Sequence, residues 1–386
     1  MRLRFAPLPL LGLLAICVSQ PALAAYEVKG LPPGKVTVTQ TEDEGTLTVR
    51  VSDGSVSVID ASGTLVLLGG APKGVTVQMG AFASSLAIDL DVALPGNLDL
   101  RLEDTVTTSF TGDANTIDGS VKITAGEGDQ LVDIAVNAPL SVGKNLQIDL
   151  GTGDDTVDEA GNDVTVGGNA SFTNVNLLET NGVTTFMKNL VWKAKKETLP
   201  TELDNDGTMQ ILGSLKFIGG ESSDRVLLNG DFTIAKNVSV AFGNTDGADH
   251  DLFTNTPGVV IGGKLSAKGQ APFQHSSVAS VVYGGDISFK IGAGEMGNLS
   301  STDLTGVFNG KSLKYSSVNS VDTVTVAMTG NPAKISMKLG DEDDTLTLDA
   351  GADIGSLSVD FGDGIDTFIN PFGGDPDFKL KTKNLP

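Results

Sequence analysis

Residues 144–157 read KNLQIDLGTGDDTV, and this stretch contains the pattern that decides the fold. It begins with a Lys-Asn turn, continues with Leu146 and Ile148 on either side of one polar residue, and ends in a corner rich in Gly and Asp. Alternation of apolar and polar residues is typical of a β-strand that buries one face. Gly, Asn and Asp favour turns. The stretch therefore predicts a short strand between two tight turns.

The same unit recurs along the chain. Fifteen apolar pairs each follow a turn, and their first members are separated by 19 to 27 residues, with a mean close to 23. These first members are Val36, Val56, Val75, Leu98, Val121, Leu146, Ala170, Leu190, Leu215, Val238, Leu265, Ile287, Leu313, Ile335 and Leu357. A unit of this size cannot bury its apolar face alone, so it must stack on its neighbours.

The repeat predicts an all-β chain that forms a single right-handed parallel β-helix, or β-solenoid, of about fifteen coils with roughly 23 residues per coil. Equivalent residues of successive coils would lie about 4.8 Å apart, which gives a rod of roughly 70 Å. We expect Ile148, Phe217, Val240, Phe289 and Val359 to point into one continuous core. A β-sandwich is the alternative, but it requires hairpin turns and strand spacings of about 8–12 residues.

The N-terminus has the three-part pattern of a secretory signal peptide. Arg2 and Arg4 precede an apolar run over residues 5–18, and Ala22-Leu23-Ala24 forms a cleavage site of small residues. We therefore expect residues 1–24 to be removed near Ala24. Residues 25–370 would form the β-helix with an N-terminal cap and a longer loop around 188–207, and residues 371–386 would form a C-terminal cap or tail.

This assignment places the mature protein outside the cytoplasm: secreted, periplasmic or at the cell surface, without a transmembrane segment. Cys17, the single cysteine, lies inside the signal, so the mature chain would have no disulfide. The alternative is a lipid anchor on Cys17, but Ile16 stands where lipoprotein cleavage requires a small residue.

The chain is acidic, with a formal net charge of −22. This excess of negative charge predicts that the protein repels nucleic acid and anionic lipid and attracts cations. Apolar residues are plentiful, so the acidity does not indicate disorder.

Aspartate recurs at the corners of the repeat, at spacings close to one coil, as at Asp104, Asp129 and Asp155, so we expect these side chains to stack along one edge of the rod. Stacked carboxylates about 5 Å apart repel one another, and a bound Ca²⁺ with hard oxygen ligands would relieve this repulsion. Alternatively, the carboxylates only accept backbone hydrogen bonds at turns. The candidate calcium ligands are Asp129, Asp154, Asp155, Asp341, Asp343, Asp344, Asp363 and Asp366.

Two of these corners, Gly151–Val157 and Gly362–Phe368, have the G-x-G-x-D-x-apolar spacing. They resemble the calcium-binding repeats of hemolysin-type proteins, and the whole chain resembles secreted bacterial β-solenoid repeat proteins. The hemolysin-type resemblance implies calcium between coils. The first Gly of that family's nonapeptide is replaced here by Leu150 or Phe361, and the nonapeptides are not in tandem.

Secreted β-helices include polysaccharide lyases and glycosidases, so an enzyme is the alternative function. Residues 244–251, NTDGADHD, resemble one signature of polygalacturonases, but the remaining signatures are missing. Arg225 beside Asp224 is the single candidate for a lyase base, and aromatic residues that could stack on sugars are few. We therefore expect a non-catalytic extracellular scaffold, adhesin-like module or matrix protein.

The stretch Lys188–Gly207 departs from the repeat, because it contains the single Trp and a cluster of lysines before an acidic turn. It predicts a loop that leaves the rod, or alternatively a loop that docks a partner. We expect the partner to be an extracellular protein or a polysaccharide rather than nucleic acid, and the protein to be a monomer.

Overall fold

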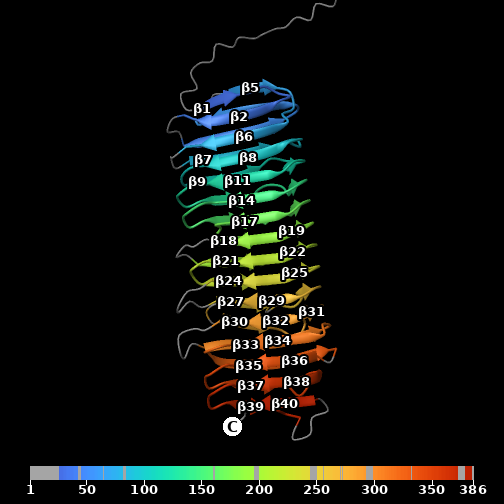
Figure 1. The fold of residues 1–386 in the computed structure, drawn as a ribbon. Coiled ribbons are helices and arrows are strands. Elements are labelled where there is room, and N and C mark those ends of the chain that lie inside the picture. The colour runs from blue at the N-terminus through green and yellow to red at the C-terminus, as the bar shows by residue number, and fades with distance from the viewer. Residues whose placement is uncertain are drawn as a thin grey trace, which may run out of the picture.

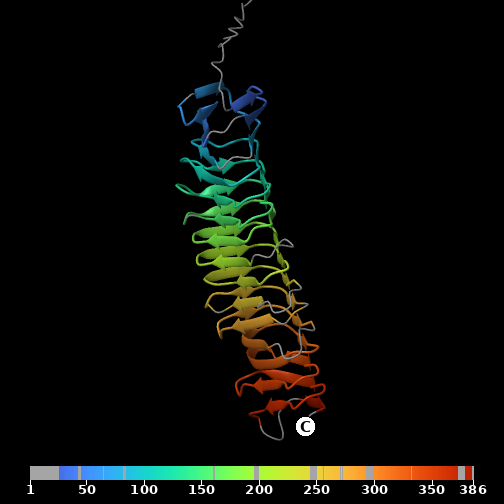
Figure 2. The same ribbon diagram turned by 90° about the vertical axis from the view of Figure 1, so that its left-hand side faces the viewer.

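The computed structural model describes residues 26–384, except 42–44, 64, 81–83, 160, 195–199, 244–249, 255, 270, 272, 293–298, 332 and 373–378. These residues form a parallel β-solenoid, a long rod in which the coils stack along one axis (Figures 1 and 2). The described part of the chain contains forty strands and no helix, and hence no helix that could cross a membrane. The all-β parallel solenoid predicted from the repeat is confirmed.

Sheet A runs along one side of the rod and has 16 strands. Its strands are β1 (Tyr26–Lys29), β2 (Lys35–Gln40), β6 (Gly74–Met79), β8 (Asn97–Leu102), β11 (Val121–Ala125), β14 (Leu146–Asp149), β17 (Ala170–Thr173), β20 (Leu190–Lys193), β23 (Leu215–Ile218), β26 (Val238–Ala241), β29 (Leu265–Lys268), β32 (Ile287–Lys290), β34 (Ser312–Ser316), β36 (Ala333–Lys338), β38 (Ile354–Asp360) and β40 (Lys379–Lys383).

Sheet B covers the opposite side and has 24 strands. Its N-terminal strands are β3 (Thr46–Ser52), β4 (Ser55–Asp60), β5 (Leu65–Gly69), β7 (Ser84–Leu90), β9 (Val106–Thr111), β10 (Thr116–Ile117), β12 (Leu131–Asp133), β13 (Leu140–Val142), β15 (Thr156–Asp158), β16 (Val164–Val166), β18 (Leu177–Thr180) and β19 (Val183–Phe186). They are followed by β21 (Thr201–Asn205), β22 (Thr208–Ile211), β24 (Asp224–Leu227), β25 (Asp231–Ile234), β27 (His250–Thr254), β28 (Val260–Ile261), β30 (Phe273–Ser277), β31 (Val282–Tyr283), β33 (Leu299–Phe308), β35 (Val321–Gly330), β37 (Thr345–Leu348) and β39 (Thr367–Ile369).

A typical coil contributes one strand to sheet A and two short strands to sheet B. In sheet A the equivalent residues of successive coils pair in parallel, as Val121 does with Leu146 and Leu146 with Ala170. About twelve regular turns of roughly 23 residues lie between β6 and β38. The period agrees with the sequence, but the regular coils are fewer than the predicted fifteen.

The difference in coil number arises mainly at the N-terminal end. Val56 and Val58, predicted as a coil of their own, lie in β4, which pairs antiparallel with both β3 and β5. The turn between β3 and β4 is Asp53-Gly54, with φ of 30° and 73°. Such a two-residue turn with positive φ is typical of a hairpin. At this end β1 also pairs antiparallel with β2, so both sheets begin with antiparallel strands.

The interior is one continuous apolar core. Ile148, Phe217, Val240, Phe289 and Val359 are all buried in it, as predicted. Rings from successive coils pack against one another: the ring centroids of Trp192 and Phe217 are 5.5 Å apart, and those of Phe217 and Phe242 are 6.2 Å apart. Burial of these inward side chains drives the coils to stack.

The single Trp belongs to this core and not to a docking loop. Trp192 is buried in β20, and its Nε1 donates a hydrogen bond of 3.1 Å to the carbonyl oxygen of Val175. Within the predicted loop 188–207, residues 190–193 and 201–205 are strands, and residues 195–199, which include Lys195 and Lys196, lie outside the described residues. The predicted C-terminal region 371–386 contributes β40, the last strand of sheet A, while residues 1–25 also lie outside the described part.

Polar side chains join successive coils at the corner that precedes sheet A. Asn145 Oδ1 accepts a hydrogen bond from the backbone N–H of Asn169, Asn169 Oδ1 accepts one from Asn189, and Asn189 Oδ1 accepts one from Ser214. Asn97 and Asn237 make the same contact with Ser120 and Lys264. This series satisfies turn N–H groups that the sheets leave without a strand partner.

Candidate functional site

The predicted aspartates occupy two separate columns at the corner that precedes sheet B. The inner corner column consists of buried residues at or just before the start of a sheet B strand, namely Gln130, Asp155, Asp224, His250, Asp322, Asp344 and Asp366. The outer corner column consists of exposed aspartates, namely Asp129, Asp154, Asp341, Asp343 and Asp363. The eight candidate calcium ligands are therefore divided between the inside and the outside of the rod.

In the inner corner column most side chains accept a hydrogen bond from the backbone of the preceding coil. The N–H of Gln130 donates to Asp155 Oδ1 over 2.9 Å, that of Asp322 to Asp344 Oδ1 over 2.8 Å, and that of Asp344 to Asp366 Oδ1 over 3.0 Å. The contact spans one coil each time, so these carboxylates hold neighbouring coils together.

In the outer corner column, the carboxylates of one coil accept hydrogen bonds from backbone N–H groups of the following coil. Asp129 Oδ1 accepts a hydrogen bond of 2.9 Å from the N–H of Asp154, and Asp343 Oδ1 accepts one of 2.7 Å from the N–H of Ile365. Asp129 therefore stacks with Asp154, whereas Asp155 stacks with Gln130 through the pairing of Leu131 with Thr156. The single ladder through Asp104, Asp129 and Asp155 that the sequence spacing indicates does not form.

Burial raises the pKa values of two inner carboxyls near the C-terminal end, those of Asp322 and Asp344. The pKa of Asp344 is raised to about 7, mainly by burial and further by the neighbouring carboxylates of Asp322, Asp366 and Glu342. The pKa of Asp322 is raised to about 6 by burial. The second oxygens of Asp344 and Asp366 are buried and have no hydrogen-bond partner among the described residues. These features favour a neutral carboxyl at Asp344 in mildly acidic solution.

No group of three or more His, Cys, Asp or Glu side chains in the described ranges is placed to hold a metal ion. Asp129 and Asp154 occupy equivalent positions one coil apart, joined by the backbone N–H of Asp154 and the Asp129 carboxylate. Asp341 and Asp363 occupy equivalent positions one coil apart, because Asp343 and Ile365 are in contact across the same step. Calcium at these corners would need backbone carbonyl oxygens or water as additional ligands.

A further buried carboxyl was missed at the sequence level. Glu159 lies next to the corner over Gly151–Val157, is 1% exposed, and accepts a hydrogen bond from Thr184 Oγ1 of the next coil. Burial raises the pKa of Glu159 to about 8. Glutamate at a corner ordinarily points to solvent, so the composition of this stretch gave no signal of its burial.

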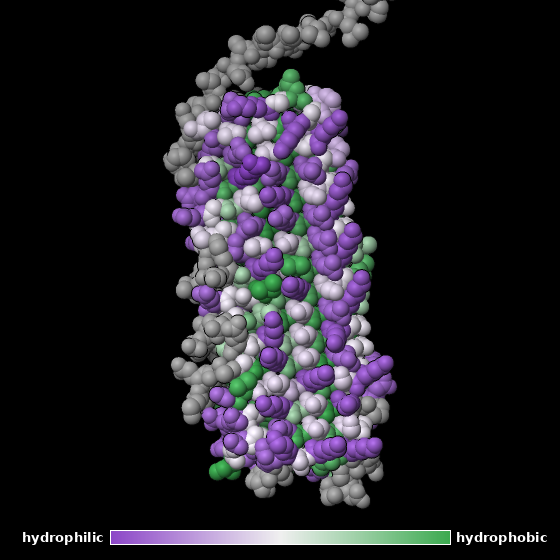
Figure 3. Space-filling view, in the orientation of Figure 1, coloured by the Kyte–Doolittle hydropathy of each residue, from purple (hydrophilic) through white to green (hydrophobic). Residues whose placement is uncertain are grey.

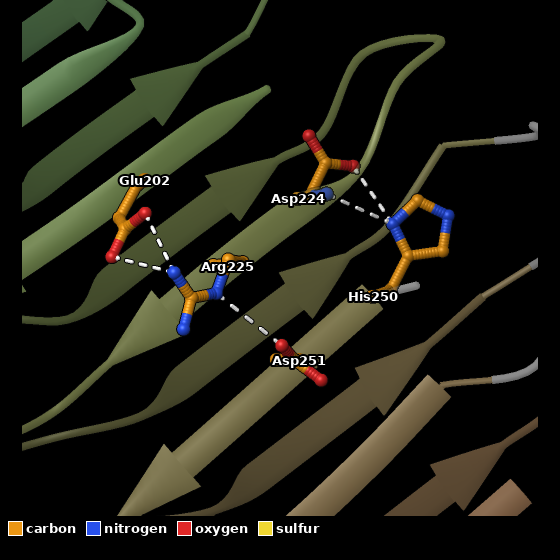
Figure 4. Close-up of polar contacts among 5 residues, drawn as sticks. All are labelled: Glu202, Asp224, Arg225, His250 and Asp251. Carbon is orange, nitrogen blue, oxygen red and sulfur yellow. Dashed lines mark hydrogen bonds and ion pairs between the residues drawn. The ribbon is translucent and has the colours of Figure 1, made fainter. Parts of the chain in front are cut away.

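Figure 4 shows how the candidate catalytic residues lie. Asp224 and Arg225 are neighbours on β24 and therefore point to opposite faces of the strand. Arg225 points outward between two carboxylates, with Nη1 2.9 Å from Glu202 Oε2 and Nε 3.3 Å from Asp251 Oδ2. The predicted lyase base is thus held in a column of ion pairs that joins three coils.

Asp224 and His250 point inward. The N–H of Asp224 donates to His250 Nδ1 over 3.1 Å, and both side chains are buried. The His250 ring stacks on Phe242 with centroids 5.2 Å apart, and burial raises the pKa of Asp224 to about 6. His250 and Asp251 of the polygalacturonase-like stretch therefore lie on opposite faces of β27, and residues 244–249 lie outside the described part.

His275, the other histidine, is also in the interior. Its Nδ1 is 2.8 Å from the carbonyl oxygen of Leu252, and burial lowers its pKa to about 4. Both imidazoles are covered by neighbouring coils, so neither is placed to contact a substrate on the surface of the rod.

Comparison of the chain with protein-family models, curated proteins and solved structures gave no match.

Proposed function

We propose that this protein is a non-catalytic, secreted β-solenoid that acts as an extracellular scaffold, adhesin-like module or matrix component. The observation that carries the proposal is the continuity of the rod. Side chains join successive coils at both corners, through Asn145, Asn169 and Asn189 before sheet A and through Asp344 and Asp366 before sheet B. Such a rod offers long surfaces of fixed geometry, which suits a protein that spaces or presents other molecules.

The positions of the polar residues also support this proposal over a carbohydrate-active enzyme. A pair of catalytic carboxyls must face the same substrate, and one of them needs a raised pKa. The carboxyls with strongly raised pKa values, Glu159, Asp224, Asp322 and Asp344, are inside the rod. Arg225 is engaged by Glu202 and Asp251.

Incubation with a panel of acidic and neutral polysaccharides tests the catalytic part of the proposal. We expect neither new reducing ends nor unsaturated sugars. Turnover that disappears in Arg225→Gln, with normal melting of that variant, would establish a lyase instead.

Secretion is tested separately by fractionation of the cells that produce the protein. We expect a chain that starts near Ala25 outside the cytoplasm, identified by N-terminal sequencing. A cytoplasmic protein that retains residues 1–24 would contradict the proposal.

A further inference from the structure

The basic side chains of this acidic protein gather on sheet A. Ten consecutive strands of this sheet, from β11 to β36, carry with the two residues before each strand thirteen exposed lysines and two acids, Asp149 and Asp286. The lysines are Lys122, Lys144, Lys188, Lys193, Lys216, Lys236, Lys264, Lys268, Lys290, Lys311, Lys314, Lys334 and Lys338. We call this surface the lysine face. Figure 3 looks onto sheet A, with a hydrophilic strip along the right-hand edge and less polar residues in the middle.

Sheet B has the opposite charge. Its described strands contain only two Lys or Arg side chains, Arg50 and Arg225. The acids on its strands between β12 and β35 are Asp133, Asp158, Glu179, Glu202, Asp204, Asp224, Asp231, Asp251, Asp303 and Asp322. The net charge of −22 is therefore an average over two unlike surfaces.

No lysine of this face makes an ion pair within the described part of the chain, although the carboxylates of Asp286 and Asp360 attract Lys264 and Lys338. In the described part of the chain, Lys29 and Lys383 are the only lysines in ion pairs, and neither belongs to the face. Asp286, one of its two acids, already accepts hydrogen bonds from the backbone N–H groups of Lys311 and Ser312. Lys268 and Lys290 are direct neighbours across β29 and β32, so their like charges repel. An external polyanion would remove this repulsion.

The shape of the face fits a chain molecule that carries hydroxyl groups. Ser239, Ser266 and Ser288 follow one another along the middle of the sheet, between the lysines of its two edges. A hollow of about 420 Å³ lies where β23 to β32 end, with Ile218, Ala241 and Phe242 on its apolar side and Lys268 and Lys290 on its charged side. A sugar ring presents a similar combination of an apolar face and a charged substituent.

We propose that the lysine face binds an acidic polysaccharide laid along the axis of the rod. Nucleic acid and anionic membrane fit it less well. The aromatic residues of these strands, Phe172, Trp192, Phe217, Phe289 and Tyr315, are all buried, so the face cannot stack on bases as single-stranded nucleic-acid interfaces do. Stacking on sugar rings is absent for the same reason, and an acidic polysaccharide would be held by charge and by hydrogen bonds to its hydroxyl groups. The strands also lack arginine, the residue that binds phosphate through two parallel hydrogen bonds.

The test is equilibrium binding to immobilised polygalacturonate and dextran sulfate, with neutral dextran as the uncharged control and duplex DNA as a competitor. The matched variant carries Lys216→Ser, Lys264→Asn, Lys268→Ala and Lys290→Ser, because each introduced residue occurs at the equivalent position of an adjacent coil. The control variant carries Glu202→Gln and Asp251→Asn on sheet B.

We expect the parent to bind both acidic polysaccharides, with affinity that falls as salt rises, and neutral dextran not at all. The lysine variant should bind at least about tenfold more weakly with unchanged melting, since four contacts are lost. Full binding by that variant, equal binding of neutral dextran, or tighter binding of DNA would overturn the inference.

This inference names a partner class for the proposed scaffold, and the two fail separately. Cleavage of a bound polysaccharide would refute the scaffold but not the lysine face, whereas absence of binding would refute the lysine face but not the scaffold.

Discussion

At the scale of single residues, the inner corner column combines two opposing effects. Asp344 holds the backbone N–H of Asp322, and its own N–H is held by Asp366, so its position is fixed. Its second oxygen is buried without a hydrogen-bond partner in the described structure. A charge there is unfavourable, and a proton removes it. The carboxyl therefore links the fold to the pH of the surroundings.

Stability should decrease as pH rises from about 5 to about 8. Asp344, with a pKa of about 7, and Glu159, with a pKa of about 8, keep protons in the folded state that the unfolded chain has released. Their stabilising contribution is complete below the unfolded pKa and is lost as pH rises through the folded pKa, on the order of 1.4 kcal/mol per pKa unit. His275 acts in the opposite sense below about pH 6.5, because its pKa is lowered to about 4. Urea unfolding measured between pH 5 and 8 gives the slope.

The variant Asp344→Asn isolates the contribution of the Asp344 carboxyl to the pH dependence of stability. Its Oδ1 can still accept the hydrogen bond from Asp322, but the group no longer titrates, so the slope above pH 5 should flatten. Glu159→Gln is the second informative variant. A parent whose stability rises steadily over this range would show that the buried carboxyls are charged in the folded state.

We predict that calcium binds at the outer corner column, because its aspartates are exposed. A weak surface site has a Kd on the order of 10⁻⁴ to 10⁻³ M, so millimolar Ca²⁺ that binds only the native state adds about 0.4–1.4 kcal/mol. Ca²⁺ should raise the melting temperature more than Mg²⁺ does, because Mg²⁺ requires stricter octahedral geometry. Asp341→Asn with Asp363→Asn should abolish that difference. Asp344→Asn with Asp366→Asn should retain it, because those side chains are buried. Equal shifts in melting temperature with Ca²⁺ and Mg²⁺ would show that the exposed aspartates stabilise turns and attract cations only diffusely.

The sequence places aspartates near this corner but cannot separate the two columns. The steps between Asp104, Asp129 and Asp155 are 25 and 26 residues, each one residue longer than the register of 24 and 25 residues between the paired strands, and a shift of one residue moves a side chain from the surface to the interior. Corner length varies from coil to coil, so spacing alone does not fix which side of the backbone a residue takes.

At the scale of strands, packing between coils supplies the stability. Phe217 on β23 lies between Trp192 of the preceding coil and Phe242, and all three rings are buried. Phe217→Ala should reduce the free energy of unfolding by about 3–5 kcal/mol, through lost burial and the cavity left behind. Chemical denaturation measures the change, with Lys216→Ala as the exposed neighbour for comparison. A decrease in the free energy of unfolding below about 1 kcal/mol would mean that neighbouring side chains move into the space left by the ring.

The repeat identifies the strands of sheet A because their inward residues must be apolar in every coil. The same alternation does not distinguish a parallel strand from an antiparallel one, since both bury every second residue. Val56 and Val58 therefore resemble a coil. Asp53-Gly54 between β3 and β4 was the available signal, because an Asp-Gly pair between alternating strands favours a hairpin.

At the scale of the whole molecule, one coil is a removable unit. Thr323 pairs with Thr345 of the next coil, so deletion of residues 323–344 joins Asp322 to Thr345 in the same register. This variant should fold, melt at a lower temperature and form a rod shorter by about 4.8 Å. Deletion of residues 323–333 removes about half a coil and should prevent folding of the C-terminal coils. Circular dichroism and small-angle scattering distinguish the two results, and equal tolerance of both deletions would contradict the register.

The unequal distribution of charge between the two sheets cannot be inferred from the composition. A net charge of −22 describes neither side of the rod, because strands of one sheet carry most of the lysines and strands of the other carry many of the acids. To assign each charge to one side of the rod, the register of every coil must be known. The apolar pairs fix this register for sheet A. For sheet B the sequence does not fix it, because the length of the corners varies.

The register between coils also bears on how such a chain evolves. A tandem duplication of one period inserts a coil whose two stacking surfaces already fit the neighbouring coils. The rod can therefore lengthen while its terminal coils stay unchanged. Each added layer of the lysine face would bring its own charges with it, and avidity for a long polymer would increase together with length. Insertions or deletions of other lengths within a strand would shift the register of the coils that follow, whereas the variable spacing of 19 to 27 residues shows that corners accept changes in length.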